Sequence, residues 1–301
     1  MIKTIKVTNS YGQSLTFTLR SPEKSGFFIK SVDGLDPVKA TINMTESLSL
    51  DGGRFNSARL NTRNIIMSIG LLTNPTIEDS RHTLYKYFPL KNEVKVVVET
   101  DTKTVQTYGR IESNEIDIFS KEESTLISIL CPESFFTSLE DQVINFSSVV
   151  SSFTFPFSNE SLVEKLIIFG NLLTTPTKNV YYDGDVPVGF QMHILISGAV
   201  GSFTIYKLET GDVMSLDADV IETLTGSSLD AGDEVYISTI KGNKRALLYR
   251  DGNEINILNA LGKDTTWMEL DRGDNTFYYS TDYGDNNLQF RIEYEELFEG
   301  I

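Results

Sequence analysis

The stretch that decides the fold is residues 34–89, GLDPVKATINMTESLSLDGGRFNSARLNTRNIIMSIGLLTNPTIEDSRHTLYKYFP. It predicts a strand, a loop, a second strand, another loop and then one short amphipathic helix. The first loop, residues 49–54, is rich in turn formers, and its glycines favour positive φ. The second strand is the isoleucine-rich run at residues 64–69, whose composition suits a buried strand.

The helix at the end of this stretch is predicted over Thr76–Phe88. Thr76 can cap its first turn, because an acidic residue, Asp79, follows three positions later. Pro75 stands just before the cap, and Pro89 ends the helix. One face of the helix collects four side chains at helical spacing: Ile77, Arg81, Leu84 and Phe88.

Strand patterns fill the rest of the first 136 residues. Residues 2–8 and 14–20 predict a hairpin, and residues 93–100 and 103–112 predict a second one. Two shorter strands are predicted at residues 115–119 and 125–130. Because consecutive strands are joined by short loops, we expect a mostly antiparallel first domain with a single helix.

The second half of the chain divides into a connecting segment and a long series of strands. Residues 137–162 lack steady periodicity and are interpreted as a linker or arm, with a weak helical signal at residues 162–166. From residue 163 to 301, turn signals recur between short strands, and the final strand, Leu288–Tyr294, alternates clearly. Many short strands at this spacing predict an antiparallel β-sandwich. The fold class is therefore all-β with one short helix.

The two halves of the chain differ in net charge. Residues 1–140 carry 16 Lys and Arg against 17 Asp and Glu, whereas residues 141–301 carry 10 against 25. The net charge of the chain is −16, so it has no general attraction for DNA or for anionic membranes. Residues 1–5 lack the apolar core of a signal peptide, and no apolar run approaches the length of a bilayer span. We expect synthesis in the cytoplasm and no membrane insertion.

Candidates for catalysis or metal binding are few. The single cysteine, Cys131, excludes an internal disulfide and a cysteine zinc cluster, and its alternating context predicts a buried core residue. His82 falls off the apolar face of the predicted helix, and His193 is expected on the outward side of a strand. No nucleophile elbow, Walker loop or dinucleotide fingerprint occurs.

The acidic residues leave two weaker alternatives. The pairs Asp183/Asp185 and Asp217/Asp219 lie in turn-rich segments, but no complete calcium-binding loop is present, so solvated turn acids are the favoured interpretation. The number of acidic residues alone does not exclude a pair of carboxylates that could hydrolyse a glycosidic bond. The acids nevertheless spread over turns and outward strand faces, which is typical of a solvated surface. We expect no enzymatic activity, no cofactor and no metal.

Several motifs resemble those of one family, the distal tail proteins of long-tailed, siphovirus-type bacteriophages. The first block has the Gly-Leu-Asp-Pro entry at residues 34–37, an Asp-Gly loop, a strand led by Arg63, and the Ser-Arg-x-x-Leu-x-x-x-Phe-Pro helix ending at Pro89. The second block has Gly-Asp-x-x-x-Ile-x-Thr at residues 232–239 and Trp-x-x-Leu at residues 267–270. Arg272 then stands where the family usually has proline before Gly-Asp-Asn.

The resemblance implies an architecture and a role. Residues 1–136 would form a tail-tube-like β-sandwich or split barrel that closes a six-membered ring, as the resemblance implies. Residues 163–301 would form a galectin-like β-sandwich. The ring would join the major tail-tube protein to the hub protein of the tip or baseplate. The second domain would be an attachment platform for receptor-binding or other baseplate proteins. The location implied is the tail tip of the virion, after assembly in the host cytoplasm.

Two sets of site residues follow. The ring-contact candidates are the loop residues Asp51, Gly52, Gly53 and Arg54. The alternative function is a carbohydrate-binding module that contacts the host cell wall through the second sandwich, with Trp267 and Glu269 as sugar contacts. Against this alternative, the His-x-Asn-Pro-Arg pattern of galectins is missing, and Trp267 falls where the family has a core aromatic residue.

Overall fold

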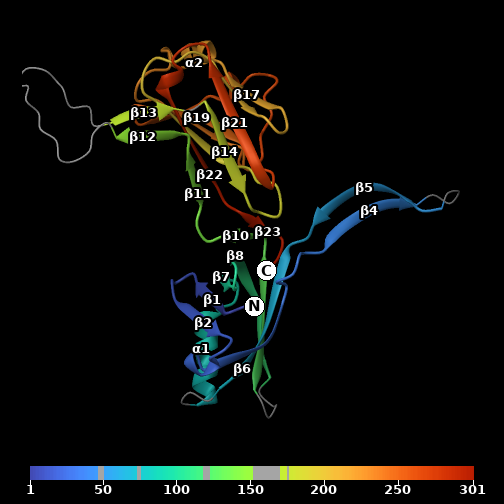
Figure 1. The fold of residues 1–301 in the computed structure, drawn as a ribbon. Coiled ribbons are helices and arrows are strands. Elements are labelled where there is room, and N and C mark those ends of the chain that lie inside the picture. Colours follow the sequence, from blue (N-terminus) through green and yellow to red (C-terminus); the bar gives the residue numbers. More distant parts are fainter. Residues whose placement is uncertain (47–50, 73–75, 118–122, 152–169, 175) are drawn as a thin grey trace, which may run out of the picture. The chain divides into compact units, whose positions relative to one another are not determined.

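The computed structural model describes residues 1–46, 51–72, 76–117, 123–151, 170–174 and 176–301, which form two compact units (Figure 1). The first unit comprises Met1–Glu140 together with Leu297–Ile301, and the second comprises Asp141–Glu296. The return of the last five residues to the first unit is not part of the boundaries predicted from the sequence. The weak helical signal at residues 162–166 lies outside the described residues. No helix in the described part of the chain is long and apolar enough to cross a membrane.

The first unit is built on one antiparallel sheet with the strand order β2-β1-β7-β8-β9-β6-β3, to which β10 and β23 are added beside β8. Its elements are β1 Thr4–Asn9, β2 Ser14–Thr18, the 3-10 turn Pro22–Lys24, β3 Phe27–Asp33, β4 Ala40–Glu46, β5 Gly53–Leu60, β6 Arg63–Leu71, α1 Ile77–Tyr87, β7 Glu93–Glu99, β8 Thr104–Asp117, β9 Ser124–Cys131, β10 Phe136–Ser138 and β23 Leu297–Phe298. The two hairpins predicted from the alternation, β1–β2 and β7–β8, are confirmed.

This sheet curls until its end strands approach each other. The ring of Phe17 on β2 lies 6.2 Å from that of Phe27 on β3, and 6.3 Å from that of Phe88 at the end of α1. Helix α1 begins as predicted, since the Thr76 hydroxyl accepts a hydrogen bond from the Asp79 amide. Leu84 is buried on its inner face. The apolar side chains of the inner face of the sheet thus enclose a core that α1 helps to cover.

One predicted strand boundary in this unit is wrong. The sequence predicts separate strands at residues 103–112 and 115–119, but the structure has one strand, β8, over Thr104–Asp117. The pairing of β8 with β9 shifts between Ile111 and Ser113, so Glu112 is a bulge residue. A bulge interrupts the period-two pattern without ending the strand, which explains the apparent break.

The second unit contains a sheet of six strands, β11-β22-β15-β18-β19-β20, and a sheet of four, β14-β21-β16-β17. Its elements are β11 Gln142–Asn145, β12 Ser147–Ser151, β13 Gly170–Thr174, β14 Thr177–Tyr182, β15 Gln191–Ile196, β16 Phe203–Lys207, β17 Asp212–Leu216, α2 Ala218–Thr225, β18 Glu234–Ser238, β19 Arg245–Arg250, β20 Asn253–Asn256, the 3-10 turns Leu258–Ala260 and Asp285–Asn287, β21 Gly273–Thr281 and β22 Leu288–Tyr294. Strands β12 and β13 pair as a separate ribbon.

Aromatic rings from the two sheets meet between them. The ring of Tyr279 on β21 lies 4.4 Å from that of Phe290 on β22, and Phe203 on β16 lies 6.3 Å from the same ring. These residues are buried, so the second unit is a β-sandwich as predicted. The fold class is confirmed as all-β, with α2 as a second short helix beyond the one expected.

Two polar features of the second unit have structural roles. Asp233, in the Gly-Asp motif, is buried and accepts hydrogen bonds from the Arg250 guanidinium at 2.7 Å and 2.5 Å. This carboxylate raises the pKa of Arg250. Asp217 caps α2, because its carboxylate accepts hydrogen bonds from the amides of Asp219 and Val220. The cap explains Asp217 without a metal ion.

Candidate functional site

A two-stranded hairpin, β4–β5, extends from the first unit and forms a sheet of its own (Figure 1). The sequence predicts one strand on either side of a loop at residues 49–54, whereas the structure has β5 over Gly53–Leu60 as an additional strand before β6. The pairing shifts after Asn43, so that Met44 faces Phe55 and Asn56 is a bulge residue. Because of this bulge, Phe55 and not Asn56 follows Leu60 and Ala58 on the same face of β5.

One face of the hairpin is apolar and the other is polar. Three directly opposed pairs make up the apolar face: Ala40 with Leu60, Ile42 with Ala58, and Met44 with Phe55. The polar face is held by cross-strand hydrogen bonds between side chains: Thr41 to Asn61 at 2.8 Å, Asn43 to Ser57 at 3.0 Å, and Asn56 to Thr45 at 2.6 Å. The hairpin therefore has the same division into an apolar and a polar face as a strand that packs one face against a core.

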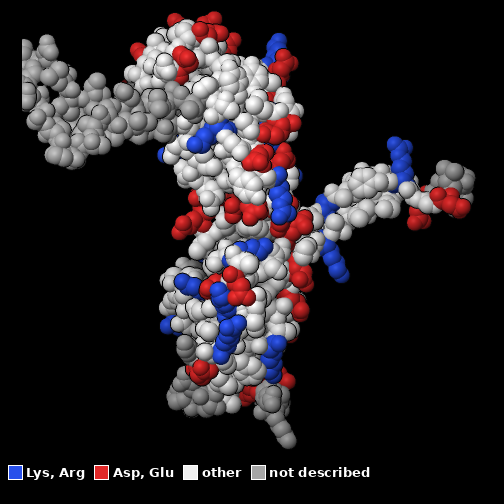
Figure 2. Space-filling model, viewed as in Figure 1, with Lys and Arg blue, Asp and Glu red and all other residues white. Residues whose placement is uncertain are grey.

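The apolar face is exposed in this chain. Ile42, Met44 and Phe55 have 54%, 59% and 60% of their surface accessible. In Figure 2 the hairpin is uncharged over most of its length. An isolated two-stranded hairpin is marginally stable in water, and an apolar face of this size is typical of a surface that binds another molecule. We name these six residues of the three opposed pairs the hairpin face.

The predicted ring-contact residues lie at the tip of this hairpin. Asp51 and Gly52 form the described part of the turn, and Gly53 and Arg54 begin β5. Gly52 has a φ of +91°, a conformation that disfavours other residues. Residues 47–50, the rest of the predicted loop, lie outside the described residues.

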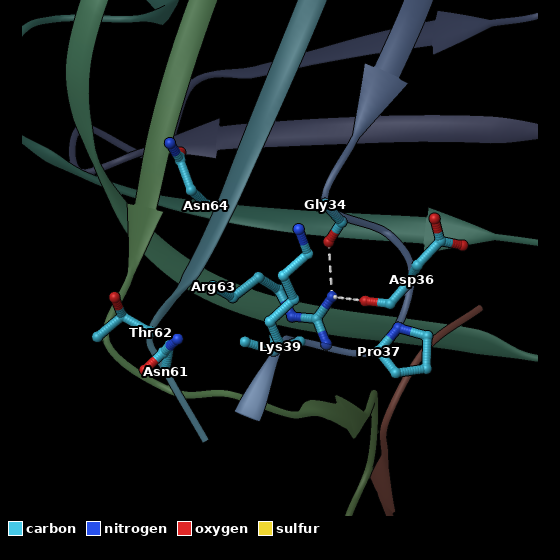
Figure 3. A pocket seen from close by; sticks show the side chains of 9 residues that line it. Gly34, Asp36, Pro37, Lys39, Asn61, Thr62, Arg63 and Asn64 are labelled. Atoms are coloured by element: carbon cyan, nitrogen blue, oxygen red, sulfur yellow. Dashed lines mark hydrogen bonds between the residues drawn. The ribbon is translucent and has the colours of Figure 1, made fainter. Parts of the chain in front are cut away.

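Arg63, the first residue of β6, anchors the root of the hairpin (Figure 3). Its side chain is 1% exposed. One terminal nitrogen, Nη1, donates to the carbonyl oxygens of Gly34 at 2.6 Å and Asp36 at 2.9 Å. The other, Nη2, donates to those of Ser134 at 2.8 Å and Glu299 at 2.6 Å. Figure 3 shows this guanidinium beneath the segment that leads into β4, where Asp36, Pro37 and Lys39 line an open pocket.

The residues around Arg63 fit this arrangement closely. Gly34 has a φ of +86°, and a Cβ atom there would lie 2.0 Å from the carbonyl oxygen of Asn64. The Arg63 guanidinium lies 4.1 Å from the centre of the Phe136 ring. The C-terminal tail is held by Lys103, whose ammonium donates to the Gly300 carbonyl at 2.9 Å and lies 4.4 Å from the Phe298 ring. The hairpin root and the tail thus share one anchor.

Burial sets the protonation behaviour of two groups near this anchor. It lowers the pKa of Arg63, which remains protonated because arginine does not deprotonate in proteins. It raises the pKa of the Cys131 thiol, although the charge of Arg63 opposes this. Cys131 is 0% exposed, as its alternating context predicts. A neutral, inaccessible thiol is inert, so Cys131 has a packing role.

The other sequence candidates are not brought together in one site. Trp267 is half-buried and the Lys244 ammonium lies 5.4 Å from its ring, while Glu269 is exposed and its main-chain carbonyl accepts a hydrogen bond from Lys207. His82 is exposed on α1. His193 lies on the outward side of β15, 2.6 Å from a Glu234 oxygen. Within the described ranges, no group of three or more His, Cys, Asp or Glu side chains is arranged to hold a metal ion.

Charged side chains are distributed differently on the two units (Figure 2). Basic and acidic side chains intermingle on the first unit, as its nearly balanced composition requires. On the second unit, acidic side chains lie at the end that carries α2, along one side and at the opposite end, with few basic side chains among them. Self-association through the first unit therefore meets little electrostatic repulsion. Second units packed closely together repel one another, because each carries an excess of acidic side chains.

Comparison with known proteins gives a match in structure and none in sequence. No protein-family model matches the chain, and no curated protein is significantly similar to it. Among solved structures, the Dit protein (gp 19.1) of phage SPP1 superposes with a TM-score of 0.64 over 98% of this chain and 99% of that one, at 12% identity. The chain has the fold of SPP1 Dit. That protein is described as a paradigm of the hub adsorption apparatus in phages that infect Gram-positive bacteria.

A more distant match is a chain of the phage P2 baseplate in its activated conformation with calcium, with a TM-score of 0.42, 11% identity and coverage of 97% and 98%. The likeness to SPP1 Dit spans both units, because it covers nearly the whole of each chain. The resemblance to distal tail proteins that the motifs indicate is thus confirmed at the level of the fold.

Proposed function

We propose that this protein is a structural virion protein that forms a ring at the distal end of a phage tail. In this proposal six copies close the ring through their first units, and the ring joins the tail tube to the hub of the tip or baseplate. The second units are attachment platforms for receptor-binding or other baseplate proteins. The protein acts by binding, without catalysis. The SPP1 Dit fold supports this role, and the exposed hairpin face is the observation that supports ring formation.

The hairpin face favours a second copy of the chain as its partner. Burying a large apolar side chain such as Ile42, Met44 or Phe55 contributes roughly 1.5–3 kcal/mol, so covering this face is strongly favourable. The same unit carries further exposed apolar side chains on β8 and β9, at Tyr108, Leu126 and Leu130. A hairpin that packs on a different surface of the next copy makes a head-to-tail contact, and such contacts form a ring when the rotation between successive copies closes.

The tip residues belong to a second kind of contact in this proposal. Asp51 and Arg54 are charged and lie at the end of the hairpin, where they can meet a neighbouring ring of the tube or hub. Replacing both with alanine is expected to impair tail assembly without unfolding the chain, because exposed turn residues contribute little to stability. Electron microscopy of particles from cells that express the other tail proteins measures assembly.

A matched control for this variant is the exposed pair Lys3 and Asp101 of the same unit, whose charged atoms lie 3.8 Å apart. Alanine at both of these positions is expected to leave assembly intact. Normal tails from the Asp51→Ala, Arg54→Ala variant refute the assignment of the tip. Defective tails from the control variant also refute it, because the effect is then not specific to the hairpin.

A further inference from the structure

The outer face of the four-stranded sheet in the second unit carries aromatic and uncharged polar side chains. Burial alternates along these strands, so one side chain in two points away from the sandwich core. We name as the tyrosine face six outward residues of β14, β16 and β21: Asn179, Tyr181, Thr204, Tyr206, Thr276 and Tyr278. Trp267, the sugar-contact candidate from the sequence, is not among them.

Two of the tyrosines form a continuous platform. Tyr206 and Tyr278 are directly opposed on neighbouring strands, with ring centres 5.9 Å apart and ring planes inclined by 32°. Tyr278 is 38% exposed. A molecule lying on the sheet therefore meets a broad aromatic surface that is open to solvent.

The third tyrosine extends the surface along the sheet. Tyr181 is 61% exposed and is opposed to Asp274, which precedes Tyr278 by four residues on β21. Four residues of a strand span roughly 13 Å, so Tyr181 lies about that far along the strand direction from the platform. Between them lie Asn179 and Thr276, which are directly opposed to each other. An occupant that contacts all three tyrosines is elongated.

Charge decides what kind of occupant fits. Two carboxylates border this face: Asp274, which accepts a hydrogen bond from Asn179 at 2.6 Å, and Glu209, which accepts hydrogen bonds from the Thr276 amide at 2.8 Å. The surrounding half of the chain has 10 basic residues against 25 acidic ones, so it repels anionic polymers. The match is therefore to an uncharged ligand that combines apolar surface with many hydroxyl groups.

We propose that the tyrosine face binds an uncharged, extended glycan. A sugar ring has an apolar C–H face, which packs on Tyr206 and Tyr278, and its hydroxyl groups can exchange hydrogen bonds with the side chains of Asn179 and Thr276. This binding site is additional to the proposed role in the tail ring and does not depend on ring formation. It would let the second unit contact a polysaccharide directly.

The test titrates three neutral hexasaccharides, maltohexaose, cellohexaose and chitohexaose, into the full chain and into three variants by calorimetry. Tyr278→Ala and Tyr206→Ala each remove one ring of the platform. Tyr283→Ala is the matched control, because Tyr283 is 56% exposed in the same unit but is not part of the tyrosine face. Fluorescence of Trp267, the only tryptophan, checks that each variant keeps its second unit folded.

We expect saturable binding of at least one hexasaccharide, with the dissociation constant raised about tenfold or more by each platform variant and unchanged by the control. Absence of binding to all three overturns the proposal, as does binding that Tyr278→Ala and Tyr206→Ala leave unchanged. If the sugar-free wild-type chain instead binds a tail protein through the tyrosine face, this face is a protein-docking surface and the proposal is wrong. None of these outcomes bears on the ring, since binding is measured per chain.

Discussion

A chain with serine at Met44 and Phe55 is expected to lose self-association while remaining folded. The two side chains face each other on the hairpin and are 59% and 60% exposed, so the folding stability of the isolated chain barely depends on them. Their burial against a neighbour is worth roughly 1.5–3 kcal/mol each, so the contact between copies weakens about 10²–10⁴-fold. Light scattering after size-exclusion chromatography measures the change in mass.

Two controls separate this effect from general changes of the surface. Leu90→Ser alters a side chain that is 57% exposed in the same unit but outside the hairpin. Asn43→Ala alters the polar face of the hairpin and leaves the apolar one intact. Both variants are expected to associate like the wild type. Association that survives in the Met44→Ser, Phe55→Ser chain would show that the hairpin face is not the contact between copies.

The second large effect is expected from Arg63→Met, which should destabilise the first unit by about 3–5 kcal/mol. Methionine keeps the apolar stem but leaves the carbonyl oxygens of Gly34, Asp36, Ser134 and Glu299 without their charged donor. Buried acceptors that lose their partners are costly. For a unit of this size, the expected fall in melting temperature is roughly 10 °C.

The chain offers one reporter for each unit in this experiment. Cys131, the only cysteine, is buried in the first unit, so thiol labelling reports the unfolding of that unit. Trp267, the only tryptophan, reports the second unit by fluorescence. Arg63→Met should lower the denaturant midpoint of Cys131 labelling and leave that of Trp267 fluorescence nearly unchanged.

The control for Arg63→Met is Arg110→Met, since the Arg110 side chain is 66% exposed and pairs with Glu93 at the surface. Exposed ion pairs of this kind contribute about 0–1 kcal/mol, so little change is expected. Equal stability of the Arg63→Met and Arg110→Met chains would contradict the anchoring role of Arg63.

The regular parts of this fold could be predicted from the sequence because local patterns decide them. The alternation in β1, β2, β7 and β22 and the capped start of α1 are signals carried by neighbouring residues. Bulges are a different case, because an extra residue shifts the alternation by one. Asn56 hides strand β5 in this way, and Glu112 makes the single strand β8 resemble two.

The candidate site could be predicted only in part, because its residues meet through tertiary contacts. The Gly-Leu-Asp-Pro entry and Arg63 stand out in the sequence, but nothing local indicates that Arg63 donates to both Asp36 and Glu299. The turn composition of residues 49–54 predicts Asp51 and Arg54 as contact residues, and this stays a prediction. The apolar hairpin face beside them was missed, because its register depends on the bulge.

The central claim is that copies of this chain form a closed ring, and the direct test is the mass of the purified protein in solution. Light scattering should give about 200 kDa, which corresponds to six copies of the 33.7 kDa chain, and negative-stain images of the same sample should show rings with a central opening. A mass of 33.7 kDa at every concentration, with no rings in the images, would contradict the claim.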